Sequence, residues 1–188
     1  MALHIAFEKS TDTFIKKLVK FVSGPYVHTE FIITEKVFDN EGNHSVTHIG
    51  YTTYMRENFG RIFQKDFWYG DEYHDFLSLQ VSQEELFRIS MACEACVESK
   101  IPYNTSDMML CTLPMRNPKE RDLYSSKTLF CSQAIVLLLR SCLDQDNKLQ
   151  EPLAFVNSRT VTPTRLYEIL KPHCDRHTKA QVMDHQRA

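Results

Sequence analysis

The sequence lacks a long apolar run. The longest one, from Ala134 to Leu139, has six residues, whereas a helix that spans a bilayer needs about 20. The first ten residues also lack the basic flank and the extended apolar region of a secretory signal. We therefore expect no transmembrane segment and an intracellular, cytoplasmic protein.

Positive charge is not in excess either. The 22 lysines and arginines are outnumbered by 24 aspartates and glutamates, the formal net charge is −2, and both signs are interspersed. Binding to a phosphate backbone requires a surface rich in lysine and arginine. The charge balance therefore argues against nucleic acid as a partner.

Internal repeats, low-complexity segments and a dense cysteine framework are absent as well. Six cysteines in 188 residues are too few for a disulfide-stabilised scaffold, so we expect reduced thiols. Hydrophobic residues make up 43% of the chain, which is enough for a core that needs no disulfide or metal for stability. Length and composition predict one domain over residues 1–170 and a polar, frayed tail at 171–188.

Hydrophobic periodicity predicts an α+β fold in which an antiparallel sheet packs on helices. The segments with helical spacing or helix-start signals are 12–21, 82–99, 130–142 and 164–170. The segments rich in β-branched and aromatic residues, which predict strands, are 26–38, 45–54, 59–69 and 73–81. A turn is expected at 39–43, between the first two of these strands.

Cys131 is placed where a thiol can be activated. The strand-like segment Thr128–Phe130 leads into a strongly apolar helix that starts at or near Cys131. Unpaired N–H groups and the positive end of the helix dipole favour a thiolate there, and the same N–H groups can stabilise an oxyanion. The alternative reading is a small buried thiol that packs as a hydrophobic residue.

His28, in the first predicted strand, is the candidate base for this thiol. Two residues are candidates for orienting its imidazole. Glu30 lies two positions further along and points to the same face of the strand, and His48 lies on the return strand. Each of the three is also compatible with an ordinary polar position on a sheet.

Two groups of residues have the spacing of zinc ligands. Cys93 and Cys96 form a CxxC pair, and His173, Cys174 and His177 form a second group. The CxxC pair lies inside a predicted helix without the usual knuckle, and the second group lies in the tail. We therefore expect no metal and no cofactor, with a zinc-stabilised interaction domain as an alternative.

Four sequence elements occur in an order that indicates a known family. These elements are Tyr26-Val27-His28 with Phe31-Ile32-Ile33, Val46-Thr47-His48 with Gly60-Arg61-Ile62, Ile101-Pro102-Tyr103-Asn104, and Phe130-Cys131-Ser132-Gln133 with Thr162-Pro163 and Leu166. Together they resemble the permuted branch of the NlpC/P60 papain-like superfamily, over roughly residues 14–170. This branch includes YiiX-type amidases, a poxvirus family and, more distantly, lecithin:retinol acyltransferase-like enzymes.

The resemblance implies a circularly permuted papain-like domain and a thiol-dependent hydrolase. Cys131 would be the nucleophile and His28 the general base, and the third polar residue of the family aligns with His48, with Glu30 as the alternative. Gln133 replaces the acidic residue that is usual after the cysteine–serine pair. The substrate would be a peptide, a protein or an acylated molecule, cleaved at an amide, isopeptide or acyl (thio)ester bond.

Two other functions stay open at this point. One is a catalytically silent papain-like binding module. The other is a lipid acyltransferase or acyl hydrolase, in which the aromatic residues Phe59, Phe63, Phe67, Trp68 and Tyr69 would line a groove for an acyl chain. The poxvirus resemblance also admits a viral enzyme that acts in the host cytoplasm or in the virion.

Overall fold

The computed structural model of the chain describes residues 2–9, 14–38, 44–53, 58–63, 70, 72–111, 119, 122–123, 126–178 and 181–182. The turn predicted at 39–43 lies outside these residues, as do Phe67, Trp68 and Tyr69. Within the described ranges, none of the helices combines the length and the apolar character needed to cross a bilayer.

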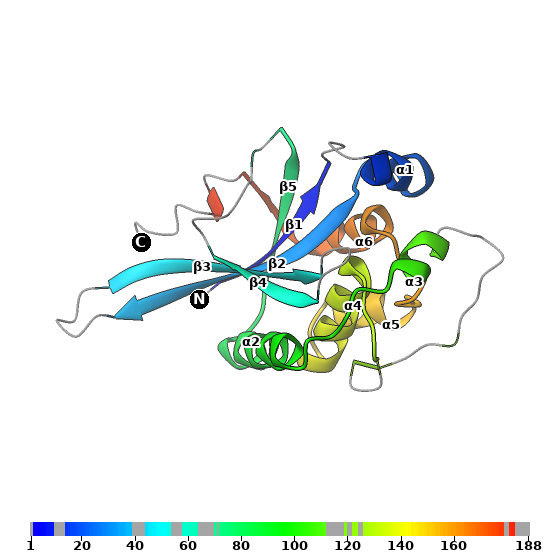
Figure 1. Cartoon of the computed structure of the whole chain (residues 1–188). Helices are drawn as coiled ribbons and strands as arrows, with labels where there is room; N and C mark the ends of the chain where they lie inside the picture. Colours follow the sequence, from blue (N-terminus) through cyan, green and yellow to red (C-terminus); the bar gives the residue numbers. More distant parts are fainter. Residues whose placement is uncertain are drawn as a thin grey trace.

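One antiparallel sheet organises the described residues (Figure 1). Its strands are β1 (Ala2–Glu8), β2 (His28–Phe38), β3 (His44–Thr53), β4 (Phe59–Phe63), β5 (His74–Leu79) and β6 (Asp175–His177), in the spatial order β4-β3-β2-β1-β5-β6. Every neighbouring pair is antiparallel. The expected α+β class with an antiparallel sheet is therefore present.

The helices pack on one face of this sheet (Figure 1). Alternation along the strands points Leu3, Ile5, Phe31 and Ile33 into the main core. The core on this face also holds side chains of α2 (Gln83–Glu98), α4 (Cys131–Cys142) and α6 (Pro163–Leu170), and α5 (Gln150–Ala154) packs against α4 and α6. Helix α4 has ten buried residues, which explains why it contains the longest apolar run rather than a single apolar stripe.

The helix starts follow the signals in the sequence. The Ser82 hydroxyl accepts from the Glu85 N–H, and the Glu85 side chain accepts from the Ser82 N–H, so the capping box at the start of α2 is formed. At the start of α6 the Thr162 hydroxyl accepts from the Arg165 N–H, and Pro163 lies in the first turn. These local rules placed both boundaries correctly.

The polar tail differs from its prediction. Residues 171–177 do not fray, because η2 (Lys171–His173) continues from α6 and β6 pairs with β5 at the edge of the sheet. Further along, Val182 is fully buried against Ala6, Ile32 and Phe76 on the face of the sheet opposite the main core. Contacts made at a distance in sequence, rather than local pattern, order this segment. The last residues, 183–188, lie outside the described part.

Candidate active site

Helix α4 begins at Cys131, as the sequence predicted. Phe130 is the N-cap, with an extended backbone and no side-chain cap, so the first N–H groups of the helix have no capping acceptor. The segment before the helix is held by hydrogen bonds from the Leu129 N–H to the Pro102 carbonyl (3.0 Å) and from the Asn104 N–H to the Leu129 carbonyl (2.7 Å). The Ser132 hydroxyl fixes the first turn by donating to the Val161 carbonyl at 2.7 Å.

The Cys131 thiol is buried and surrounded by backbone amides. The amides of Thr29, Ser132 and Cys131 itself are near enough to stabilise its thiolate, and only 3% of Cys131 is exposed. These amides favour the thiolate, but burial has the larger effect and raises the pKa of the thiol to about 11, with a smaller contribution from the charge of Glu8. The buried Cys131 side chain is therefore a protonated thiol at neutral pH, and not the thiolate that its place at a helix start predicted.

The thiol lies where β3 separates from β2. The ladder between these strands ends at the pair Phe31–Tyr51. Beyond it, side chains take the place of backbone partners at Thr29: its N–H points to Cys131, and its carbonyl accepts from the Thr52 hydroxyl at 3.0 Å. The thiol therefore lies close to the peptide that joins His28 to Thr29.

Thr52 also orients the imidazole of His28. The distance between Thr52 Oγ1 and His28 Nε2 is 3.1 Å. Because the hydroxyl donates its single proton to the Thr29 carbonyl, it accepts at the second contact, and the proton of a neutral His28 lies on Nε2. The lone pair of the imidazole is then on Nδ1, the nitrogen that can act as a base.

The resting imidazole is neutral. Burial is the main cause that lowers the pKa of His28, to about 3, and the positive charges of Lys16 and of a protonated His74 act in the same direction. Together with the protonated thiol, this gives a neutral pair rather than a thiolate and an imidazolium. Such a pair needs either proton transfer during attack or a more hydrated state before it reacts.

His48 does not orient His28. The register places His48 opposite Thr34, which is six residues beyond His28 and therefore about 20 Å away along β2. It is fully buried, and its Nδ1 is 2.9 Å from Thr34 Oγ1. The prediction failed because a hairpin register cannot be read from the sequence of two strands alone.

By strand alternation Glu30 lies on the same side of β2 as His28, the side of Ile32 that faces away from the main core, and it is 5% exposed. The acceptor on His28 Nε2, however, is Thr52, which belongs to the return strand and was not singled out in the sequence. No sequence signal distinguishes Thr52 from the other threonines of that strand. The role of Glu30 stays a prediction.

Neither a protein-family model, nor a curated protein, nor a solved structure matches this chain.

A buried ion pair supports the segment that leads to the thiol. Asp107, in the first turn of α3 (Thr105–Leu110), accepts from Arg159 Nε at 2.9 Å and Nη2 at 3.0 Å. Asn104 caps the same helix through the Asp107 N–H at 2.8 Å. Tyr103, next to Asn104, lies close enough to Cys131 for a thiolate charge to raise its pKa, although burial is the main cause of that rise.

The cysteines proposed as zinc ligands lie in different surroundings. Cys93 and Cys96 pack in the main core between α2 and α4, and burial raises the pKa of both thiols. Zinc binds thiolates, which these apolar surroundings disfavour. His177 belongs to β6 at the far edge of the sheet. No three potential ligands gather among the described residues.

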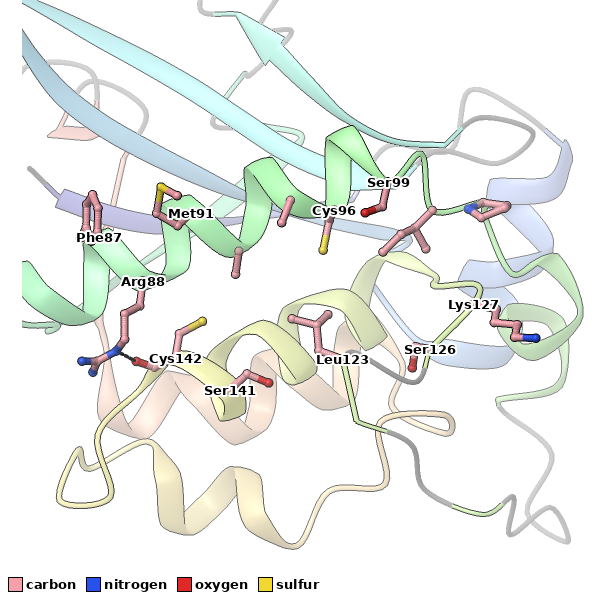
Figure 2. Close-up of a pocket in the computed structure, with 14 residues that line it drawn as sticks. Phe87, Arg88, Met91, Cys96, Ser99, Leu123, Ser126, Lys127, Ser141 and Cys142 are labelled. Atoms are coloured by element: carbon pink, nitrogen blue, oxygen red, sulfur yellow. Dashed lines mark hydrogen bonds between the residues drawn. The ribbon is translucent and has the colours of Figure 1, made fainter.

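A separate groove of about 670 Å³ lies between α2 and α4 (Figure 2). Phe87, Met91 and Leu123 make much of its wall apolar, and Arg88 lies near one end and Lys127 near the other. Neither Cys131 nor His28 lines it, but Lys127 is only four residues before the thiol. Phe59, expected from the sequence to line a groove, is instead 2% exposed in the core.

Proposed function

We propose that this chain is a cysteine-dependent hydrolase in which Cys131 is the nucleophile and His28 the general base. One observation supports the proposal: the amide of Thr29, next to His28 in β2, is close to the Cys131 thiol at the start of α4, and Thr52 holds the neutral His28 imidazole with its lone pair on Nδ1. The bond cleaved would be an amide, peptide, isopeptide or acyl (thio)ester bond.

The chemistry would proceed in two halves. In the first, Sγ of Cys131 bonds to the carbonyl carbon while its proton passes to Nδ1 of His28, and the N–H groups at the start of α4 stabilise the oxyanion. The bond to the leaving group then breaks, and His28 returns the proton to that group. In the second half, water attacks the acyl-enzyme, His28 takes its proton, and the thiol is released with an acid product.

The order of elements supports a permuted papain-like arrangement. The histidine strand β2 precedes the cysteine helix α4 in the chain, and the helix packs on the sheet through Ala134, Leu138 and their neighbours. This is the order that the sequence resemblance implies. We therefore propose the permuted papain-like fold together with the hydrolase activity, because a fold alone does not imply an activity.

The test is the pH dependence of Cys131 alkylation by iodoacetamide, followed by peptide mapping. We expect a single apparent pKa for the native chain that changes in His28→Ala, together with at least about a tenfold change in rate at neutral pH. His48→Ala is the matched control, because it removes another strand histidine far from the thiol. Cys131→Ser identifies the labelled position.

The outcomes separate two functions. A rate that depends on His28 but not on His48 supports the catalytic pair and justifies a substrate search. A rate indifferent to both histidines refutes the pair and makes the catalytically silent binding module the better account.

The groove favours an acyl substrate as a second candidate. A volume of about 670 Å³ with a largely apolar wall suits the tail of an acylated molecule better than a polar peptide. Ala95→Trp, which fills the groove from α2, should then reduce turnover of long-chain acyl thioesters and leave short-chain thioesters unaffected. An equal effect on both would exclude the groove from substrate binding.

A further inference from the structure

Helix α1 (Phe14–Ser23) carries positive charge only. Its sequence, FIKKLVKFVS, contains Lys16, Lys17 and Lys20 and no acidic residue, in a chain whose net charge is −2. The remaining positions are apolar except for the final serine. A short helix with this composition is a basic amphipathic helix, which is typical of segments that lie on membrane surfaces.

The inner side of α1 covers the candidate active site. Val19 and Tyr103 both pack against the cluster of Met108, Cys111 and Phe130, and Phe130 is the residue before Cys131. Lys16 pairs with Glu8 at 2.6 Å, and its charge also acts on His28. One helix therefore lies near the residue before Cys131 and carries a charge that acts on His28.

The outer side of α1 is basic and apolar together. Phe21 is 86% exposed, and Lys17 and Lys20 are exposed with no ion pair to any residue that the structure describes. Lys17 and Phe21 are four residues apart, so they lie on the same side of the helix. A large exposed aromatic side chain next to two lysines is complementary to a surface that is both anionic and apolar below its charged layer.

Helix α1 ends at a glycine in the left-handed conformation. Gly24 follows the helix with a φ of +97°, and its N–H donates to the Lys20 carbonyl at 3.1 Å. Next to it, the Tyr26 N–H donates to the Thr164 hydroxyl of α6 at 3.1 Å. The chain is thus fixed to α6 immediately after the helix. The helix itself packs beside α6, and Val19 and Lys16 connect it to the Phe130 cluster and to Glu8.

We propose that α1 is a lid over Cys131 and His28 and that an anionic lipid bilayer opens it by binding Lys17, Lys20 and Phe21. This inference rests on the proposed function for its consequence, access to the thiol, but membrane binding itself does not. On the bilayer, the apolar side of α1 exchanges its contacts with Phe130 and Tyr103 for lipid. Water and substrate then reach the Cys131 thiol.

A bilayer fits this helix better than an acidic protein segment does. Lysines alone would suit either partner, but the exposed Phe21 gains little from a string of carboxylates and much from the acyl region of a lipid layer. The charge also makes the interaction dependent on anionic lipid and on salt.

The first experiment measures binding of the full chain to vesicles by co-sedimentation. Vesicles of phosphatidylcholine with phosphatidylserine should bind the chain, and vesicles of phosphatidylcholine alone should not. The double variant Lys17→Glu/Lys20→Glu should weaken binding by at least about tenfold, since each lysine near an anionic surface contributes several-fold to affinity. Lys119→Glu/Lys148→Glu is the matched control with the same change in charge at two other exposed lysines.

The second experiment measures Cys131 alkylation with and without the vesicles. We expect at least a tenfold acceleration on the anionic vesicles, lost in Lys17→Glu/Lys20→Glu and retained in the control. Binding without acceleration would overturn the lid, and absence of binding would overturn the whole inference. Equal acceleration by soluble polyglutamate would replace the bilayer with an acidic protein partner.

The proposed function can fail separately from this inference. If anionic vesicles accelerate alkylation equally in the native chain and in His28→Ala, the lid is supported and the catalytic pair is refuted. If His28 matters in solution but vesicles do not bind, the pair is supported and the lid is refuted.

Discussion

Thr52→Val is the most informative single substitution in this molecule. Thr52 is 2% exposed and makes two hydrogen bonds, one to the Thr29 carbonyl at 3.0 Å and one with His28 Nε2 at 3.1 Å. Valine has nearly the same shape but can neither donate nor accept. The substitution therefore removes the orientation of the imidazole and leaves the packing of β3 largely unchanged.

The magnitude follows from the two lost contacts. A net contribution of about 1 kcal/mol for each hydrogen bond predicts a loss of about 2 kcal/mol in the free energy of unfolding. For reactivity, loss of the preferred tautomer and orientation is expected to cost about 1.4 kcal/mol, which corresponds to a tenfold lower His28-dependent alkylation rate.

Thr34→Val is the matched control. Thr34 is 4% exposed and holds His48 across the same two strands at 2.9 Å, about 20 Å from His28. It should lose about 1 kcal/mol in urea unfolding, for its one hydrogen bond, and show an unchanged rate of Cys131 alkylation. Thr52→Ser, which keeps the hydroxyl, should restore the rate.

The measurement is the alkylation rate against pH for the native chain, both valine variants and the serine variant. The reasoning is wrong if Thr52→Val and Thr34→Val change the rate equally, because the effect would then be one of stability. It is also wrong if Thr52→Val lowers stability and leaves the pH profile unchanged.

Three further outcomes are expected. Because the folded-state pKa of His28, about 3, lies below its ordinary 6.5, the unfolded chain binds more protons between those values. The free energy of unfolding should therefore decrease as the pH is lowered from 6.5 towards 3, and His28→Gln should reduce this decrease in urea titrations. Asp107→Asn breaks a buried ion pair and should cost about 3–5 kcal/mol by urea unfolding, against less than about 1 kcal/mol for Glu168→Gln at an exposed pair. Gly24→Ala, at positive φ and with a new Cβ 2.9 Å from a neighbouring side chain, should lower the thermal midpoint, whereas Gly60→Ala, whose nearest atom would be 3.8 Å away, should cost much less.

Local sequence rules predicted where α2 begins but not the structure of the tail. A capping box, an apolar period and a proline in the first turn are properties of a few neighbouring residues, so the starts of α2 and α6 were predictable. The short helix α5 and strand β6 have no such signal, and the second of these is ordered by pairing with β5. The polar composition of residues 171–188, taken alone, predicted a frayed tail.

The sequence by itself determined that Cys131 lies at the start of an apolar helix and that His28 lies in a strand, because both depend on residue types within one turn or a few alternating positions. Only the tertiary structure decided which side chain orients the imidazole. That choice depends on the register between β2 and β3, which places His48 opposite Thr34 and leaves Thr52 beside His28. The protonation of the thiol was decided there too, because burial under neighbouring elements outweighs the amides of the helix start that the sequence revealed.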